Sequence, residues 1–311
     1  MLKHWRLAFV LALTVMMSVF ISACGGSGSG SSGGTTPAAT TGASTLGTPG
    51  TFTCETGKIT ASGSTALAPL VKNVAANYQT KCSGASITVN LGGSSTGLSQ
   101  AEAGSVDIGN SDIYKKAGQD DLVDHQVAVV VFAVIVNSKV TGVKSLTTDQ
   151  LKSIYSGKTT NWKDVGGPDL KIVVVSRPAS SGTRATFQNY VLGGPESISG
   201  PQSLTTDSTS TVIQNVAQND GAIGYAATGP LKGANVTTIS IDGNAPTLDV
   251  VKNNTYKFWG PEHMYTKGPA KPLAQALIDY MASDYGKQQA QNLGFLQVSD
   301  IDPAALQAHP K

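Results

Sequence analysis

Strand-like and helix-like segments alternate along the chain from Lys58 onward, and this alternation limits the fold more than any other feature. Residues 127–136 form an apolar run rich in Val, which predicts a strand buried on both faces. Apolar residues at helical spacing predict a helix over residues 65–80. The pattern predicts an α/β protein with mostly parallel sheets flanked by helices. The other predicted strands are 58–61, 86–91, 106–109, 171–175 and 223–226, and the other predicted helices are 96–103, 147–153, 183–192, 211–218, 272–284 and 286–293.

Residues 1–23 have the pattern of an export signal. Two basic residues precede an apolar run over 7–21, which is short for a membrane span. Small residues then lead to Cys24, as in the lipobox of bacterial lipoproteins, where the cysteine takes a lipid such as palmitate and becomes the new N-terminus. The alternative is an ordinary secretory signal with an incidental cysteine. Residues 24–56 are predicted to form a lipidated cysteine and a flexible tether, because 25–50 are almost entirely Gly, Ser, Thr, Pro and Ala.

The charge balance argues against one class of partner. Removing Lys3 and Arg6 with the signal leaves 22 − 2 = 20 basic residues against 20 acidic ones. A protein that binds nucleic acid by neutralising phosphates needs an excess of basic residues. We therefore expect no nucleic-acid partner, and any bound anion must be held by a local site.

Two cysteines remain in the mature chain, Cys54 and Cys82. An exported protein with two cysteines favours one disulfide, which would tie the start of the folded region to the end of the first helix. A metal pair and two free buried thiols are the alternatives. No histidine stands near either cysteine, so we expect no metal.

Three strand-to-helix junctions share one chemistry. Residues 62–65, 92–97 and 180–183 are rich in Gly, Ser and Thr, and each opens a predicted helix. The first turn of a helix has unpaired N–H groups and partial positive charge, and glycines let a ligand approach that backbone. One such loop is most often a simple helix cap. Three of them, with Arg177 just before the third, predict an oxyanion site.

Asp112 also follows a predicted strand, where a ligand site is expected. A carboxylate repels an anion unless the anion has a proton to donate. Hydrogen phosphate has such a proton at neutral pH and sulfate does not, so Asp112 would reject sulfate. A turn or helix-cap aspartate is the alternative interpretation.

In these motifs the chain resembles the substrate-binding protein of bacterial phosphate ABC transporters. The resemblance covers about residues 58–311. Its motifs are Gly63-Ser64-Thr65 with Ala68-Pro69, Gly93-Ser94-Ser95-Thr96-Gly97, Val106 through Asp112, Arg177 with Ser181-Gly182-Thr183, Gly221-Ala222-Ile223-Gly224-Tyr225, and Trp259 through Lys267.

The resemblance implies a two-lobed clamp of the type II periplasmic-binding-protein fold, with each lobe a mixed, mostly parallel sheet. The first lobe would combine residues 57–135 and 257–311, and the second would be 136–256. Two crossing strands, at 127–136 and 256–267, would join them. The ligand shell implied by position comprises Thr65, Ala66, Ser94, Asp112, Arg177, Ser181, Gly182 and Thr183.

Within that shell, Thr65 and Ser94 would donate hydroxyls, Asp112 would accept the phosphate proton, and Arg177 would supply the full positive charge. Two positions depart from many relatives. Ala66 replaces an aromatic residue, and Ala179 replaces an acid that would orient Arg177. Arg184 follows the third loop and either adds charge or pairs at the surface.

The resemblance also implies a non-enzymatic, monomeric receptor without cofactor. It would bind inorganic phosphate on the outer face of the cell membrane, anchored by its lipid, and deliver it to membrane permease subunits. One alternative is a receptor for sulfate, tungstate or molybdate, and another is an adhesin or sensor on the same fold. A secreted serine hydrolase with Ser95 as nucleophile needs a histidine base, for which the sequence offers only His125, His263 and His309 after the signal.

Overall fold

We describe a computed structural model of the chain, in which residues 52–201 and 203–309 are described. The predicted signal peptide at 1–23, the lipidation site Cys24 and most of the tether lie outside these residues. Within the described part of the chain, no helix is long and apolar enough to cross a membrane.

The helices and strands follow the predicted alternation. The strands are β1 Gly57–Gly63, β2 Ala85–Leu91, β3 Ile108–Ser111, β4 Leu122–Asn137, β5 Ser145–Leu146, β6 Val173–Ser176, β7 Ser203–Thr205, β8 Ala222–Ala227, β9 Val236–Ile241 and β10 Trp259–Lys267. The α-helices are α1 Ala68–Lys81, α2 Ser94–Glu102, α3 Thr148–Tyr155, α4 Gly182–Phe187, α5 Thr209–Gln218, α6 Leu248–Lys252, α7 Pro272–Met281, α8 Asp284–Asn292 and α9 Pro303–Ala308, and a π-helical segment, η2 Gln188–Leu192, continues α4.

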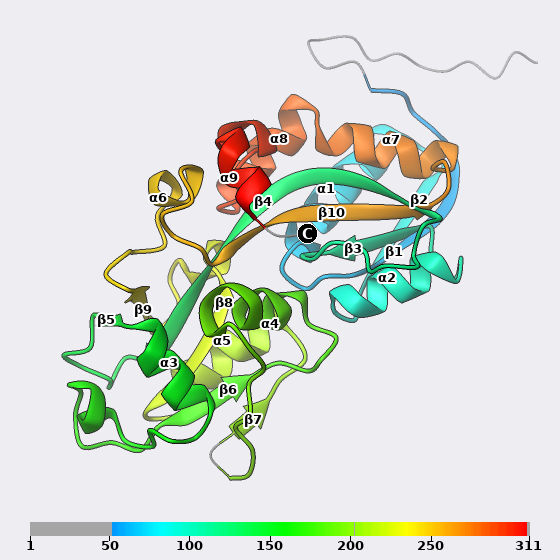
Figure 1. Cartoon of the computed structure of the whole chain (residues 1–311). Coiled ribbons are helices and arrows are strands. Elements are labelled where there is room, and N and C mark those ends of the chain that lie inside the picture. The colour runs from blue at the N-terminus through cyan, green and yellow to red at the C-terminus, as the bar shows by residue number, and fades with distance from the viewer. Residues whose placement is uncertain (1–51, 202, 310–311) are drawn as a thin grey trace, which may run out of the picture. The chain divides into compact units, whose positions relative to one another are not determined.

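β4 joins two groups of strands, as Figure 1 shows. Residues up to Val131 pair with β10, in the order β2-β1-β3-β10-β4, and residues from Phe132 on pair with β8, in the order β4-β8-β6-β7. Residues 134–137 of β4 also pair with β9, along the edge opposite to β8. The run of Val and Ile suits this strand because its last ten residues, 128–137, are buried.

The sheets are more mixed than the alternation alone predicts. β1 pairs in parallel with β2 and β3, and β6 pairs in parallel with β7 and β8. β4 and β10, the strands nearest the crossing, pair only in the antiparallel sense. A strand that returns along its neighbour has to run antiparallel, so the crossing itself imposes this departure.

Several element boundaries differ from the sequence prediction. The predicted helix over 65–80 begins at Ala68 instead, because the Ser64 hydroxyl accepts hydrogen bonds from the N–H groups of Ala66 and Leu67 and holds a turn before it. The helix predicted over 211–218 begins two residues earlier, at Thr209, with Ser208 as its cap. The short strands β5, β7 and β9 and the helices α6 and α9 were not predicted.

Helices cover both sheets. α1, α2 and α7 pack on the first sheet, and α4 and α5 pack on the second. α2 lies very close to the strands beneath it, since a Cβ added at Gly97 would stand 2.7 Å from the Ser62 carbonyl oxygen. Cys54 and Cys82 form a disulfide across a Cα separation of 5.2 Å, which ties residue 54 to the end of α1. This is the first of the three states that the sequence left open.

Candidate functional site

The predicted loops meet at the carboxyl ends of β1, β2, β3 and β6. The Ser95 N–H donates to the Ser180 carbonyl at 3.0 Å, which joins the second loop to the third. A Cβ added at Gly182 would stand 2.8 Å from the Ser94 Cβ and 2.9 Å from the Asp112 Cβ. Glycine at 182 therefore permits the third loop to lie directly against Ser94 and Asp112. Ligands of open α/β sheets bind at this position.

Asp112 is held by hydroxyl groups from both sheets. Its backbone N–H donates to the Ser94 Oγ at 2.9 Å, and its Oδ2 accepts from the Thr183 Oγ1 at 3.0 Å. The side chains of Ser94 and Thr183 are buried, and Asp112 is 4% exposed. Its Oδ1 receives no hydrogen bond from an amide or hydroxyl donor of the described residues. One carboxylate oxygen is thus left to accept a proton in a buried site.

Arg177 lies on the other side of the same site. Its Nη2 donates to the Thr65 Oγ1 at 3.0 Å and to the Asp207 carbonyl at 3.2 Å, and its Nε donates to the Thr206 carbonyl at 3.2 Å. The side chain is 1% exposed, and Nη1 has no partner among the described residues. Burial lowers the pKa of the guanidinium, and the charge of Asp112 partly restores it. The arginine is therefore a buried cation with one donor group still available for an anion.

Backbone carbonyls, and no acid at position 179, hold Arg177, since residue 179 is an alanine. The carbonyls of Thr206 and Asp207 hold Arg177 in position without neutralising its charge. They come from the turn before α5, and the Thr209 N–H of that helix donates to the Thr65 Oγ1 at 3.3 Å. The sequence analysis missed Thr209. Residues 207–211 contain four consecutive hydroxyl residues at a helix start, the same signal as the other loops without a glycine.

Arg184 fixes the backbone of the third loop. Its Nη1 donates to the Arg177 carbonyl at 2.8 Å, and its Nε lies 3.4 Å from the Glu196 Oε2. Glu196 also accepts hydrogen bonds from the hydroxyls of Ser176 and Tyr225. Burial raises the pKa of Glu196, while those two hydrogen bonds and the charge of Arg184 lower it again. Arg184 is therefore a half-buried partner of the buried Glu196, with 24% of its side chain exposed.

The remaining predicted residues lie around this cluster. Ser181 caps α4 by accepting from the Arg184 N–H at 3.3 Å, and Gly182 and Thr183 begin that helix. The Ala66 N–H, expected to face a ligand, donates to the Ser64 Oγ at 3.1 Å. All eight predicted positions are buried. Hydrogen bonds or close approaches join Thr65 to Arg177, and join Asp112 to Ser94, Gly182 and Thr183.

The three histidines that a hydrolase would need have other partners. His125 contacts the Thr266 Oγ1 at 3.2 Å, and the His263 Nδ1 lies 2.7 Å from the Asp124 Oδ1. His309 contacts the Trp259 carbonyl at 2.5 Å. None is hydrogen-bonded to Ser95 within residues 52–201 and 203–309. Those residues also contain no cluster of three or more His, Cys, Asp or Glu side chains that could hold a metal ion.

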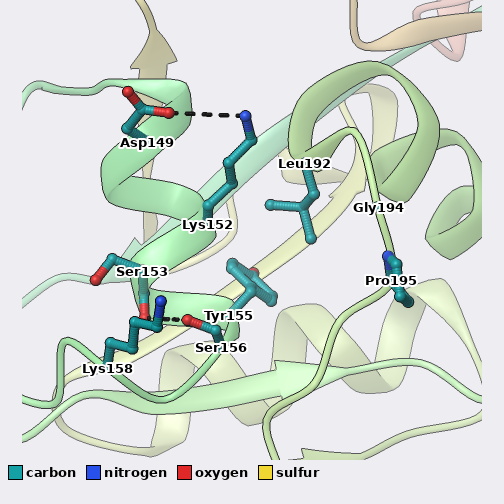
Figure 2. A pocket seen from close by; sticks show the side chains of 9 residues that line it. All are labelled: Asp149, Lys152, Ser153, Tyr155, Ser156, Lys158, Leu192, Gly194 and Pro195. Atoms are coloured by element: carbon teal, nitrogen blue, oxygen red, sulfur yellow. Dashed lines mark hydrogen bonds and ion pairs between the residues drawn. The ribbon is translucent and has the colours of Figure 1, made fainter.

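Two cavities differ in their relation to this cluster. A cavity of about 690 Å³ adjoins it, and its lining includes Asp112, Lys116, Asn189 and Tyr190, which come from both sides of the site. A separate pocket of about 340 Å³ lies beside α3. Its lining residues include Lys152, Lys158 and Tyr155 (Figure 2). None of the predicted ligand residues lines the second pocket, so we do not assign the anion site to it.

The fold, with a buried polar cluster between its two groups of strands, is that of a substrate-binding protein of the periplasmic-binding-protein type. A family model described as the PBP superfamily domain matches residues 35–285. The phosphate-binding protein PstS of Bacillus subtilis (strain 168) is 46% identical over 250 residues, which cover 79% of this chain and 82% of that protein. The chain belongs to the PBP superfamily and, within it, to the family of the phosphate-binding protein PstS.

Two solved structures support the same assignment. A phosphate ABC transporter substrate-binding protein from Clostridium perfringens, solved with bound phosphate, is 32% identical, with a TM-score of 0.73 over 78% of this chain and 100% of that one. An ABC-type phosphate transport receptor from Vibrio cholerae is 30% identical, with a TM-score of 0.64 over 77% of this chain and 99% of that one. These neighbours confirm the predicted α/β fold of two lobes.

Proposed function

We propose that the chain binds inorganic phosphate and delivers it to an ABC permease for import. The observation that carries this proposal is the pair of unpartnered groups in one buried site, the Arg177 Nη1 and the Asp112 Oδ1. One group can donate to an oxyanion and the other can accept the proton of hydrogen phosphate. The phosphate-binding relatives support the same ligand.

Each predicted residue has a role that its surroundings support. Arg177 supplies the positive charge, and Thr65, Ser94, Ser181 and Thr183 supply hydroxyl or backbone donors near it. The backbone N–H groups of Ala66 and Gly182 complete the shell, in the case of Ala66 by sharing its hydrogen with the Ser64 Oγ. Asp112 selects the protonated anion, because an ion without a hydrogen would place two acceptors in contact.

Binding is coupled to closure of the lobes, in this proposal. Thr65, Ser94 and Asp112 belong to the lobe of residues 57–135 and 257–311, and Arg177 with 181–183 belongs to the lobe of 136–256. The strand partners of β4 change at Val131 and Phe132, slightly before the proposed boundary. A ligand that contacts both lobes favours the closed state, which a permease can distinguish from the open one.

The proposal extends to location and chemistry. The receptor acts outside the cytoplasmic membrane, held there by a lipid on Cys24, and works as a monomer without catalysis. The engaged histidines support a binding role over a hydrolytic one. Docking on the permease subunits follows from the transport role.

Calorimetric titration of the phosphate-free chain tests the function. Phosphate is expected to bind with submicromolar affinity, while sulfate, tungstate and molybdate at the same concentration give no comparable heat. Absence of phosphate heat, or equal affinity for sulfate, would contradict the proposal.

A further inference from the structure

Glu262 is a buried acid that the proposed ligand shell does not contain. It lies on β10, which runs between β3 and β4, and its side chain is 0% exposed. His263 pairs with Ser111 in the antiparallel register, so the next position along each strand places Glu262 opposite Asp112. Neighbours in such a pair have Cβ atoms about 5 Å apart. The two carboxyl groups are therefore neighbours, and the charge of Asp112 is close enough to raise the pKa of Glu262.

A hydrogen bond between two carboxyl groups requires a proton on one of them. The Oδ2 of Asp112 already accepts a hydrogen bond from the Thr183 hydroxyl, and the charge of Asp112 interacts with that of Arg177. Neither oxygen of Glu262 receives a hydrogen bond from an amide or hydroxyl donor of the described residues. The β4 residue opposite Glu262 is Ala128, which offers no charge.

The charge therefore belongs on Asp112 and the proton on Glu262. Burial, with the nearby charge of Asp112 added to it, raises the pKa of Glu262 well above its usual value. A buried carboxyl group without cationic partners avoids the large cost of desolvating its charge by staying neutral. As a neutral acid it has one hydrogen to donate, and the neighbouring carboxylate of Asp112 can accept it.

We propose that Glu262 is a positioning residue that remains protonated and donates its hydrogen to Asp112, keeping Asp112 ionised and oriented as the acceptor for the proton of the bound anion. This inference rests on the proposed function for the identity of the anion. It adds a residue from the strand between β3 and β4 to the control of selectivity. In this proposal Asp112 can accept the phosphate proton because Glu262, which does not contact the ligand, keeps its own proton and leaves Asp112 ionised.

Two variants separate the hydrogen-bond donor from simple packing. Glu262→Gln keeps a neutral donor of almost the same size, and Glu262→Leu removes the donor and keeps the bulk. Phosphate affinity, measured by calorimetry on the full chain in detergent, is expected to stay within about threefold in the Gln variant and to fall about tenfold or more in the Leu variant.

The double variant tests whether Glu262 acts through Asp112. Adding Glu262→Leu to Asp112→Asn should weaken phosphate binding by much less than it does in the unaltered chain. An equal loss in both backgrounds, or a Gln variant as weak as the Leu variant, would overturn the inference. Failure of the unaltered chain to bind phosphate would overturn the proposed function instead.

A spectroscopic measurement keeps the inference testable if the Leu variant does not fold. The infrared spectrum of the full chain at pH 7 should contain a protonated carboxyl band that shifts on ¹³C labelling of glutamate and is absent from Glu262→Gln. This reading needs no phosphate. If no such band exists, Glu262 is ionised and the inference is wrong.

Discussion

The two sides of the site bury charges of opposite sign, and each stabilises its charge in a different way. On one side stands Asp112, with Glu262 behind it, so two acids are buried together. On the other stands Arg177, with the Arg184–Glu196 pair behind it. The first side is kept at a single negative charge by a proton on Glu262. The second keeps its positive charge because carbonyl oxygens, rather than a carboxylate, hold the guanidinium. One side thus selects for a proton on the ligand, and the other supplies the attraction.

Removing the positive charge should have the largest effect. In Arg177→Ala the buried anion loses its only full counter-charge in the proposed shell, and phosphate binding should weaken by about 3 to 5 kcal/mol. Arg177→Lys should recover part of this, since it restores charge without the planar donors. Calorimetry measures both, and equal circular dichroism spectra serve as the control. If Arg177→Ala bound phosphate as tightly as the unaltered chain, the hydroxyl and backbone N–H donors alone would be enough to hold the anion.

The two sides also meet outside the site, through His309. Its ring lies 3.9 Å from that of Trp259 on β10 and 3.9 Å from that of Tyr190 in η2. Burial lowers the pKa of His309 to about 4. As the pH falls below 6.5, the ordinary pKa of histidine, the unfolded chain protonates His309 before the folded chain does.

Folding stability should therefore fall between pH 6.5 and about 4 by up to about 3 kcal/mol and level off below that range. His309→Phe keeps the stacked ring and cannot titrate, so this share of the pH dependence should disappear. Urea unfolding at a series of pH values measures it. An identical pH profile in the variant would show that the stack is not coupled to folding.

A smaller effect is expected at Asp112. In Asp112→Asn the amide can donate to an ion that carries no hydrogen, so sulfate should begin to compete while phosphate binding weakens by about 2 kcal/mol. Competition calorimetry with sulfate at pH 7 measures the change. If sulfate still fails to compete, the sorting of anions lies elsewhere in the site.

The smallest effect is expected behind Arg177. Tyr225→Phe removes one hydrogen bond to Glu196 and leaves the Arg184 contact in place, so phosphate affinity should fall by about 1 kcal/mol or less. Arg184→Met should cost more, because it releases the Arg177 carbonyl. Calorimetric titration of both variants measures the two losses. A larger loss in Arg184→Met than in Tyr225→Phe would show that Arg184 links Glu196 to the position of Arg177.

Local patterns in the sequence predict the central strand, several helices and the candidate site residues. The Val-rich run predicts β4, because a strand buried on both faces needs apolar residues throughout. The hydroxyl-rich loops indicate where helices follow, but only Ser181 of the third loop caps its helix through its side chain, while α1 begins three residues after its predicted start and α2 two residues before it. Asp112, Arg177 and residues 181–183 are predicted site residues because they follow predicted strands at the edge where ligands bind, and the structure places Thr183 against Asp112.

Tertiary structure decided the rest. The proximity of Glu262 to Asp112 depends on the register of β10 against β3, and the carbonyls that hold Arg177 come from a turn about 30 residues further along the chain. No local pattern specifies either, since each depends on which distant segments become neighbours. The sequence by itself therefore determines the chemistry of single residues and short segments. Packing determines which buried groups are charged, because it controls their access to water and to each other.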